Sequence, residues 1–198
     1  MTNIKPVRLI KLGGSLLSLP NLSEKFHRWC RENPHPLTLI IVGGGGIVEA
    51  VRDIHQANPL ADEFAHWLCI DLMKHTARLA HQILGNVDLY ESMDDLQQPF
   101  SKSKKGGSTP IIAVVKVGIY FKPDDPKMGL PAAWEVTSDA MAAAFSKMVA
   151  ADTLIMMKSV DVPDGCGLED LAAIGLVDPY FADLVGETEV RFVNLRTF

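Results

Sequence analysis

Short, mostly apolar runs alternate along this chain with longer segments in which apolar residues recur every three or four positions. An apolar run of strand length that lacks polar alternation indicates a strand buried on both faces. The runs therefore predict strands at residues 7–11, 37–42, 87–90, 111–115, 153–157 and 190–193.

The segments between the predicted strands have helical spacing. In residues 61–84 the apolar positions recur as one face of a helix requires; they are Phe64, Leu68, Leu72, Leu79 and Ile83. Similar patterns predict helices at residues 21–33, 46–57, 138–150, 168–174 and 180–184. Two remaining stretches are rich in polar residues, glycine or proline, so we expect a mobile surface loop at residues 94–110 and a turn-rich connection at residues 123–131.

The alternation of strands and helices predicts an α/β fold with a mainly parallel, open sheet and helices on both faces. The sequence contains no internal repeat and no linker-like segment, so residues 1–198 are expected to form a single domain. Ligands of such sheets bind beyond the carboxyl ends of the strands. The residues that follow each strand are therefore the candidate site residues.

Composition narrows the class of protein and of partner. Hydrophobic residues make up 47% of the 198 residues and charged residues 22%, which is typical of a globular protein. The net charge of −5 argues against a nucleic-acid partner. Three widely spaced cysteines are expected to be free thiols in a reducing compartment. The chain shows neither a signal peptide nor the roughly 20 apolar residues of a membrane span, so we expect a soluble cytoplasmic protein without a membrane partner.

The first strand carries a lysine and ends in Gly13-Gly14-Ser15. Glycines let the backbone bring its N–H groups close to an anion, and Lys11 adds a positive charge beside them. A single Gly-Gly turn is equally typical of a tight strand-to-helix connection with a lysine that reaches solvent. This element by itself favours that simpler interpretation.

A second glycine element shifts the balance from a simple turn towards an anion-binding site. Four consecutive glycines, Gly43, Gly44, Gly45 and Gly46, follow the strand at 37–42 and precede a predicted helix. One glycine is enough for a turn, and the N-terminus of a helix favours an anion; a loose loop is the alternative. Together the two elements predict a site for two anionic groups, such as ATP and an acidic acceptor. The chain contains no P-loop sequence, and a dinucleotide fingerprint fails at Val48.

Two charged residues outside the glycine elements are further candidates. Asp139 opens a predicted helix in Thr137-Ser138-Asp139, where capping of the helix is the simpler interpretation and positioning of a catalytic lysine is the functional one. Lys158 ends the strand at 153–157, where it either meets a ligand or marks the exit of the strand to solvent. Lys116 is a weaker candidate of the same kind. The six histidines lack metal-ligand spacing, so we expect no protein metal site.

Taken in order, these elements resemble the amino acid kinase family, which includes acetylglutamate kinase, aspartokinase, bacterial uridylate kinase and isopentenyl phosphate kinase. Residues 11–15 are similar to its opening Lys-x-Gly-Gly-Ser, and residues 41–45 to its second glycine loop. Residues 137–143 are similar to its Asp-x-x-Ala helix start, and residues 154–161 to the strand before its Thr-Asp-Val-Asp-Gly segment. The four matches occur in the family's order.

The resemblance implies a three-layer αβα sandwich that transfers the γ-phosphoryl group of ATP, with Mg²⁺, to a small phosphate- or carboxylate-bearing acceptor. It implies that Lys11 stabilises the transferred group and that Asp139 orients the lysine side chains. It assigns the nucleotide phosphates to Gly13, Gly14, Ser15, Ser159 and Asp161, and the acceptor to Gly43, Gly44, Gly45 and Gly46. Family members are commonly oligomeric, so a homo-oligomer is expected. Acceptor choice is expected to depend on side chains from the long helix and from residues 116–136.

The chain departs from the family near its end. Residues 158–165 replace the expected Thr-Asp-Val-Asp-Gly, and no lysine follows Lys158, which is expected to substitute for a second catalytic lysine. The short length and residues 175–181 resemble the compact kinases of methanofuran synthesis, which phosphorylate an aminomethylfuran-methyl phosphate. The alternatives are a non-catalytic nucleotide- or oxyanion-binding protein on the same fold and, more weakly, a nicotinamide-dependent oxidoreductase.

Overall fold

One parallel sheet runs through the protein. The computed structural model describes residues 6–101, 109–122 and 130–198. Its strands lie in the order β3-β4-β2-β1-β5-β6, and each neighbouring pair is parallel. The strands are β1 (Val7–Leu12), β2 (Leu37–Val42), β3 (Asp88–Tyr90), β4 (Ile111–Val115), β5 (Thr153–Lys158) and β6 (Glu189–Asn194).

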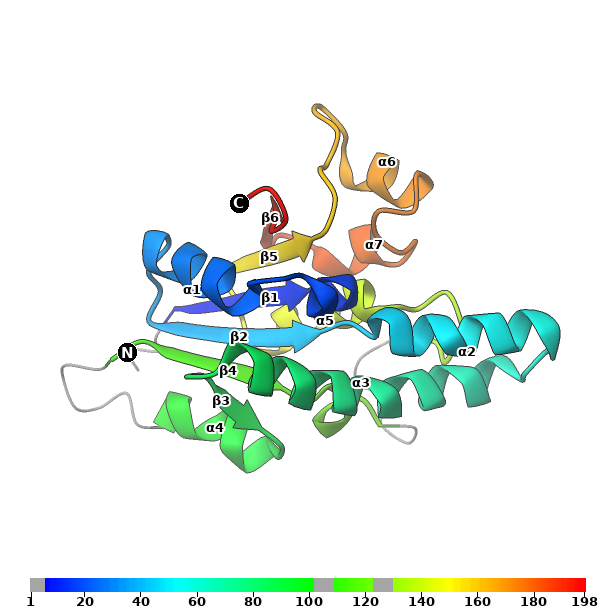
Figure 1. Ribbon diagram of the computed structural model, residues 1–198, viewed down its shortest axis with the longest axis horizontal. Coiled ribbons are helices and arrows are strands. Elements are labelled where there is room, and N and C mark those ends of the chain that lie inside the picture. The colour runs from blue at the N-terminus through cyan, green and yellow to red at the C-terminus, as the bar shows by residue number, and fades with distance from the viewer. Residues whose placement is uncertain (1–5, 102–108, 123–129) are drawn as a thin grey trace.

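Helices cover both faces of this sheet (Figure 1). The α-helices are α1 (Leu22–Glu32), α2 (Gly45–Ala57), α3 (Asp62–Leu84), α4 (Met93–Ser101), α5 (Ser138–Met148), α6 (Leu168–Ala173) and α7 (Phe181–Val185). Helix α1 and the C-terminal half of α3 pack on one face, and α5 with α7 packs on the other. The predicted α/β class with a parallel sheet between two helical layers is therefore confirmed.

The central strands are mostly apolar because their side chains alternate between two cores. In β2, Leu37, Leu39 and Ile41 belong to the core that includes α5, whereas Ile40 and Val42 belong to the core that includes α1. Strands β1, β4 and β5 alternate in the same way. A strand between two cores has no solvent side and so carries almost no polar residue.

This alternation also decides where two lysines point. Lys11 follows Leu9 by two positions in β1, and Lys158 follows Met156 by two positions in β5. Both Leu9 and Met156 belong to the core that includes α5. Side chains two apart share a face of a strand, so both lysines project towards α5 at the carboxyl ends of adjacent strands.

Helix α3 is longer than the sheet can cover. Its 23 residues span about 35 Å at a rise of ~1.5 Å per residue, whereas a six-residue strand such as β2 spans about 20 Å. The N-terminal half of α3 therefore extends with α2 beyond the arrowheads of the strands (Figure 1). This overhang forms one wall above the carboxyl edge of the sheet.

Residues 93–101 form helix α4, so the predicted surface loop at 94–110 was wrong in its first half. Ser92 and Asp95 cap the helix reciprocally: the backbone N–H of Asp95 donates to Ser92 Oγ at 3.1 Å, and that of Ser92 donates to Asp95 Oδ2 at 3.0 Å. This is a capping box, and Leu96 anchors the helix in the core. The rest of the predicted loop at 102–108 and most of the connection at 123–131 lie outside the described residues.

Candidate active site

The two glycine elements interlock at the carboxyl ends of β1 and β2, which are neighbours in the sheet. A Cβ atom added to Gly14 would lie 2.1 Å from the backbone nitrogen of Gly45, and one added to Gly43 would lie 2.9 Å from that of Gly14. Gly45 also has a φ of +55°, which favours glycine. These three glycines are thus required for the close approach of the two loops, a reason that neither the ligand nor the turn and loose-loop interpretations of the sequence included. At Gly46 an added Cβ would meet no atom within 4 Å.

One cavity of ≈850 Å³ opens at this edge of the sheet. Of the site residues that the family resemblance assigned, it brings together all but one; the lining includes Lys11, Gly13, Gly14, Ser15, Gly43, Gly44, Gly45, Gly46, Asp139, Lys158 and Ser159. Asp161 is the exception, and its Oδ1 accepts a hydrogen bond of 2.8 Å from Asn194 Nδ2. The volume lies within the range of roughly 300–1,000 Å³ typical of small-molecule sites.

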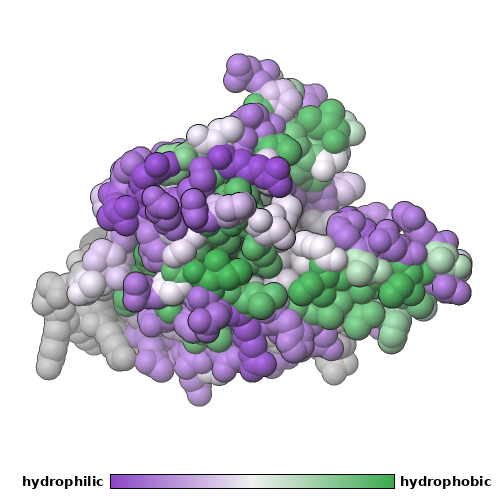
Figure 2. All heavy atoms as spheres, in the orientation of Figure 1, coloured by the Kyte–Doolittle hydropathy of each residue, from purple (hydrophilic) through white to green (hydrophobic). Residues whose placement is uncertain are grey.

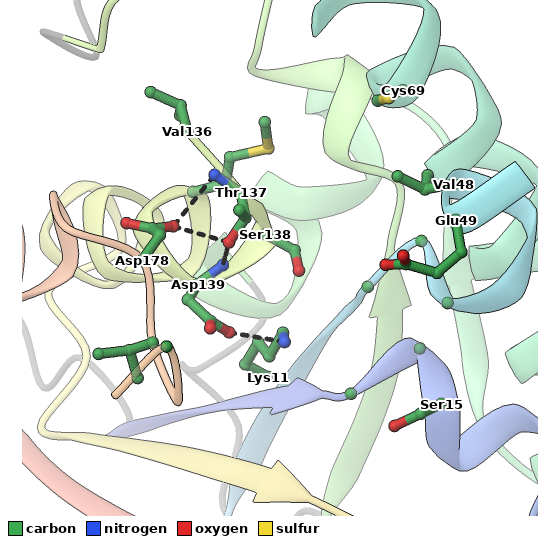
Figure 3. A pocket seen from close by; sticks show the side chains of 18 of the residues that line it. Lys11, Ser15, Val48, Glu49, Cys69, Val136, Thr137, Ser138, Asp139 and Asp178 are labelled. Carbon is green, nitrogen blue, oxygen red and sulfur yellow. Dashed lines mark hydrogen bonds and ion pairs between the residues drawn. The ribbon is translucent and has the colours of Figure 1, made fainter. Parts of the chain in front are cut away.

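Two lysines share one carboxylate at the floor of the cavity. Lys11 Nζ lies 2.6 Å from Asp139 Oδ1 as an ion pair without the angles of a hydrogen bond (Figure 3). Lys158 Nζ donates to Asp139 Oδ2 at 2.8 Å. All three side chains are at most 12% exposed. The cluster therefore places a surplus positive charge, two ammonium groups against one carboxylate, in a poorly solvated position.

The start of α5 explains how Asp139 reaches the lysines. Thr137 caps the helix, and its Oγ1 accepts from the backbone N–H of Asp139 at 3.3 Å. This places Asp139 in the first turn, above the ends of β1 and β5. The capping interpretation and the lysine-positioning interpretation of this segment are therefore compatible, because Thr137 supplies the cap and Asp139 contacts both lysines.

The charges within the cluster shift each other's pKa values. Burial alone would raise the pKa of Asp139, but the two lysine ammonium groups outweigh it and hold that pKa below its ordinary value. Burial lowers the pKa of Lys158, and repulsion from Lys11 lowers it further, although attraction to Asp139 opposes both effects. Asp139 thus stays ionised as the shared partner, and Lys158 gives up its proton more easily than an exposed lysine.

Asp178 is a residue of this site that the sequence analysis missed. Its buried Oδ2 accepts from the backbone N–H of Thr137 at 3.0 Å, from the hydroxyl of Thr137 at 2.7 Å and from the backbone N–H of Ala140 at 2.8 Å. Two residues earlier, the carbonyl of Leu176 accepts from Lys158 Nζ at 2.7 Å. The segment 176–178 therefore holds both the start of α5 and Lys158, and no local spacing in the sequence connects these positions.

Replacement of Asp178 by asparagine is expected to lower the free energy of unfolding by about 2 kcal/mol, because a charged acceptor of three hydrogen bonds becomes a neutral one. For a chain of this size such a loss lowers the melting temperature by roughly 4–8 °C. Thermal unfolding followed by circular dichroism measures it. Asp183→Asn, an exposed aspartate of α7, is the matched control, and equal melting temperatures for the two variants would contradict the assignment.

The remaining predicted residues differ in whether they line the cavity. The hydroxyls of Ser15 and Ser159 lie 3.0 Å apart and join the loops that follow β1 and β5. Lys116 does not line the cavity but pairs with Glu91 at the end of β4. The weaker of the two strand-end lysine candidates is thus held in a different ion pair.

The overhanging helices supply the opposite wall of the cavity, across from Lys11 and Asp139 (Figure 3). Glu49 of α2 and Cys69 of α3 lie on this wall (Figure 3); Arg52, His66 and Trp134 also line the cavity. They come from α2, the long helix and residues 130–136, of which the sequence had indicated the last two. In the described part of the chain, no group of three or more histidine, cysteine, aspartate or glutamate side chains is placed to hold a metal ion.

Comparison with known proteins yields one family and one set of structures. The sequence model of the amino acid kinase family matches residues 6–164. The structure is similar to uridylate kinase from Archaeoglobus fulgidus, with a TM-score of 0.60 and 14% identity over 93% of this chain and 88% of that chain. It is also similar to UMP kinase from Bacillus anthracis, with a TM-score of 0.66 and 12% identity over 98% of this chain and 88% of that chain. For UMP kinase from Ureaplasma parvum the TM-score is 0.58, with 15% identity over 95% of this chain and 88% of that chain. No curated protein sequence matches the chain.

Proposed function

The chain belongs to the amino acid kinase family and is a kinase, and on that premise we propose that it transfers the γ-phosphoryl group of ATP to a small phosphate- or carboxylate-bearing acceptor. One observation carries the proposal. Lys11 and Lys158 share Asp139 in the same cavity that two interlocked glycine loops line. The site thus combines two glycine loops with a buried cluster that carries a surplus positive charge, which suits two anionic substrates.

The residues act by position and charge. Phosphoryl transfer passes through a loose transition state whose charge spreads over the phosphoryl oxygens, so catalysis depends mainly on alignment and electrostatic stabilisation. Lys11 and Lys158 stabilise this charge, and Asp139 holds the two ammonium groups together against their mutual repulsion. The hydroxyls of Ser15 and Ser159 bind nucleotide phosphates together with the amide of Gly14. Gly13 forms the turn, and its own N–H donates to the carbonyl oxygen of Met157 at 2.9 Å. The loop of residues 43–46 binds the acceptor.

ATP and Mg²⁺ fit this arrangement differently. The glycine loops, which let a ligand approach the backbone closely, and the two lysines suit the phosphate chain of ATP. The described residues offer no carboxylate cluster for a metal, so we propose that Mg²⁺ is held mainly by the phosphate oxygens. When bound, the ion supplies additional charge neutralisation.

The acceptor that we place first is an aminomethylfuran-methyl phosphate, because the compact chain resembles the short kinases that use it. UMP is second, since the similar solved structures are uridylate kinases. Each is incubated with Mg·ATP and enzyme, alongside acetylglutamate as a carboxylate acceptor, and ³¹P NMR follows ADP and product. We expect a diphosphate to form in step with ADP. Stabilisation of the protein by Mg·ATP without transfer to any acceptor would favour the non-catalytic nucleotide-binding alternative.

The pH dependence of turnover tests the role of Lys158. Because its pKa is lowered from 10.5 by burial and by Lys11, we expect kcat to fall on the alkaline side through a pKa below that value as the ammonium is lost. Arginine stays protonated, so Lys158→Arg should move any remaining alkaline loss to higher pH. An alkaline limb at the same pH in this variant would show that another group is responsible.

We propose that the protein is a homo-oligomer that uses the outer surface of α3. Figure 2 shows hydrophobic side chains gathered along this helix; Phe64, Leu79 and Ile83 are exposed there. Leu79→Glu is expected to lower the molar mass measured by light scattering to that of a smaller assembly, because a charge is costly in an apolar interface. Met148→Glu on α5, also exposed, is the matched control. An unchanged mass for Leu79→Glu, or an equal loss in both variants, would contradict this surface.

We place the protein in the cytoplasm. Its cysteines are free thiols, which suits a reducing compartment. Among the described residues, no helix combines the length and the apolar character needed to cross a bilayer.

A further inference from the structure

The wall of the cavity opposite the lysines contains a buried histidine. His66 lies on α3, is 4% exposed and lines the cavity. Its Nδ1 lies 3.0 Å from the carbonyl oxygen of Ala133. Its ring packs edge-on against Trp67, with the centroids 4.9 Å apart. The backbone of residue 133 and the ring of residue 67 therefore fix the orientation of the imidazole.

The partner of Nδ1 decides which ring nitrogen carries the proton. A carbonyl oxygen only accepts hydrogen bonds, so Nδ1 is the donor and a neutral ring carries its lone pair on Nε2. Burial lowers the pKa of His66, which favours this neutral form at physiological pH. Nε2 has no hydrogen-bond partner in the described parts of the chain. It is also not among the enclosed polar atoms such as Trp67 Nε1, so it retains access to the cavity.

The flat indole ring of Trp134 is a second feature of this wall of the cavity. Trp134 lines the same cavity, and its ring stacks on His55 with a centroid distance of 5.0 Å. The guanidinium carbon of Arg52 lies 5.8 Å from the Trp134 ring centroid, and Arg52 also pairs with Glu49 at 2.8 Å. The indole is thus held in place, and the neighbouring charges on α2 largely neutralise each other.

We propose that His66 determines acceptor specificity: its Nε2 accepts a hydrogen bond from an O–H or N–H group of the acceptor, whose flat or apolar body lies against Trp134. This inference rests on the proposed function, because it concerns the acceptor side of the same cavity. The substrate class is a phosphate- or carboxylate-bearing molecule that carries a hydrogen-bond donor away from its reacting group. An acceptor with only carboxylate or carbonyl oxygens at that end would place two acceptors face to face and leave both without a partner.

The expected discrimination follows from the cost of a buried polar atom without a partner. Loss of one such hydrogen bond typically weakens binding by about ten- to a hundredfold. The effect should appear in the dissociation constant of the acceptor and leave the affinity for ADP unchanged, because the lysines and the glycine loops are not altered.

The first test concerns the imidazole itself. In protein labelled with ¹⁵N at histidine, the His66 resonances are assigned by their loss in His66→Phe. We expect a neutral ring protonated at Nδ1 at pH 7.5. A ring protonated at Nε2, or at both nitrogens, would overturn the proposal because no lone pair would face the cavity.

The second test uses matched pairs of acceptors, measured by calorimetry in the presence of ADP. One pair is aminomethylfuran-methyl phosphate and its analogue with methyl in place of aminomethyl. The other is UMP and its N3-methyl derivative, which lacks the N–H donor. In the wild-type protein the donor-bearing member of at least one pair is expected to bind at least about tenfold more tightly.

Two variants of His66 complete the test. His66→Phe keeps a flat ring but lacks the lone pair, so it should abolish the preference, whereas the side-chain oxygen of His66→Gln should restore part of it. Equal affinities within both pairs, failure of both donor-bearing members to bind, or a preference that survives in His66→Phe would overturn the inference. Failure of the proposed function is distinguishable, because it appears as no phosphoryl transfer from Mg·ATP to any acceptor.

Discussion

Replacement of Lys11 by alanine is expected to lower kcat by at least about a hundred- to a thousandfold, the cost typical of losing one transition-state donor. Lys11 Nζ lies beside the loop after β1 and contacts Asp139 at 2.6 Å. Without it, Asp139 and Lys158 form a neutral pair, and the cluster loses the surplus charge that would stabilise the phosphoryl oxygens. The loss should appear mainly in kcat, because the charge that Lys11 neutralises increases as the transition state forms.

Two controls make this result specific. Lys116→Ala removes another partly buried strand-end lysine, which pairs with Glu91 outside the cavity, and should leave turnover close to that of the wild type. Lys11→Met preserves most of the side-chain volume without the charge and should be as impaired as Lys11→Ala. Near-wild-type turnover in either Lys11 variant would remove this lysine from catalysis.

Replacement of Asp139 by asparagine is expected to lower the free energy of unfolding by about 3–5 kcal/mol, the usual cost of leaving a buried charge uncompensated. Two ammonium groups would then face each other without the carboxylate that now contacts both. Turnover should also fall, because the lysines would no longer be held at the ends of β1 and β5. Chemical denaturation with urea measures the loss of stability, and steady-state kinetics measures the loss of turnover.

The loss of stability in Asp139→Asn is expected to depend on pH in a definite direction. The pKa of Lys158 is already below 10.5 in the folded protein, and removal of Asp139 lowers it further because the opposing attraction is lost. Between the folded pKa and 10.5 the unfolded chain binds more protons, so stability rises with pH in that interval. The deficit of Asp139→Asn should therefore shrink as the pH is raised. The stability deficit should also be smaller in the double variant Asp139→Asn with Lys158→Met, because one of the two ammonium groups is then absent. Additive losses in that double variant would contradict the shared cluster.

The hydrophobic pattern and the residue types at the strand ends were sufficient to predict much of the candidate site. The apolar runs predicted each of the described strands. The reason is clearest for the central strands, which lie between two helical layers and are apolar on both faces. Parallel strands end at one edge of the sheet, so Lys11, the glycine loops and Lys158 were expected to lie close together, and the structure gathers them in one cavity. Their roles in phosphoryl transfer remain predictions for the variants above to test.

Three features of the structure were not predicted correctly from the sequence, each for a physical reason. Helix α4 was missed although Ser92 and Asp95 form a capping box, because the polar character of its exposed face resembled a loop. Asp161 matched a motif position, yet it lies outside the cavity lining and binds Asn194. The run of glycines was also interpreted as a place where a ligand lies against the backbone, whereas Gly14, Gly43 and Gly45 are needed for contact between the loops themselves.

The sequence by itself determined the layered α/β fold, the edge of the sheet at which the candidate site lies and the residue types available there, because periodicity and glycine turns are local properties of a chain. Only the tertiary structure decided that Asp139 contacts both lysines, that Asp178 caps α5 from 38 residues away, and that His66 lines the same cavity. These contacts join segments whose separation in sequence is arbitrary. Their geometry follows from how α3, α5 and the segment after α6 pack around the sheet.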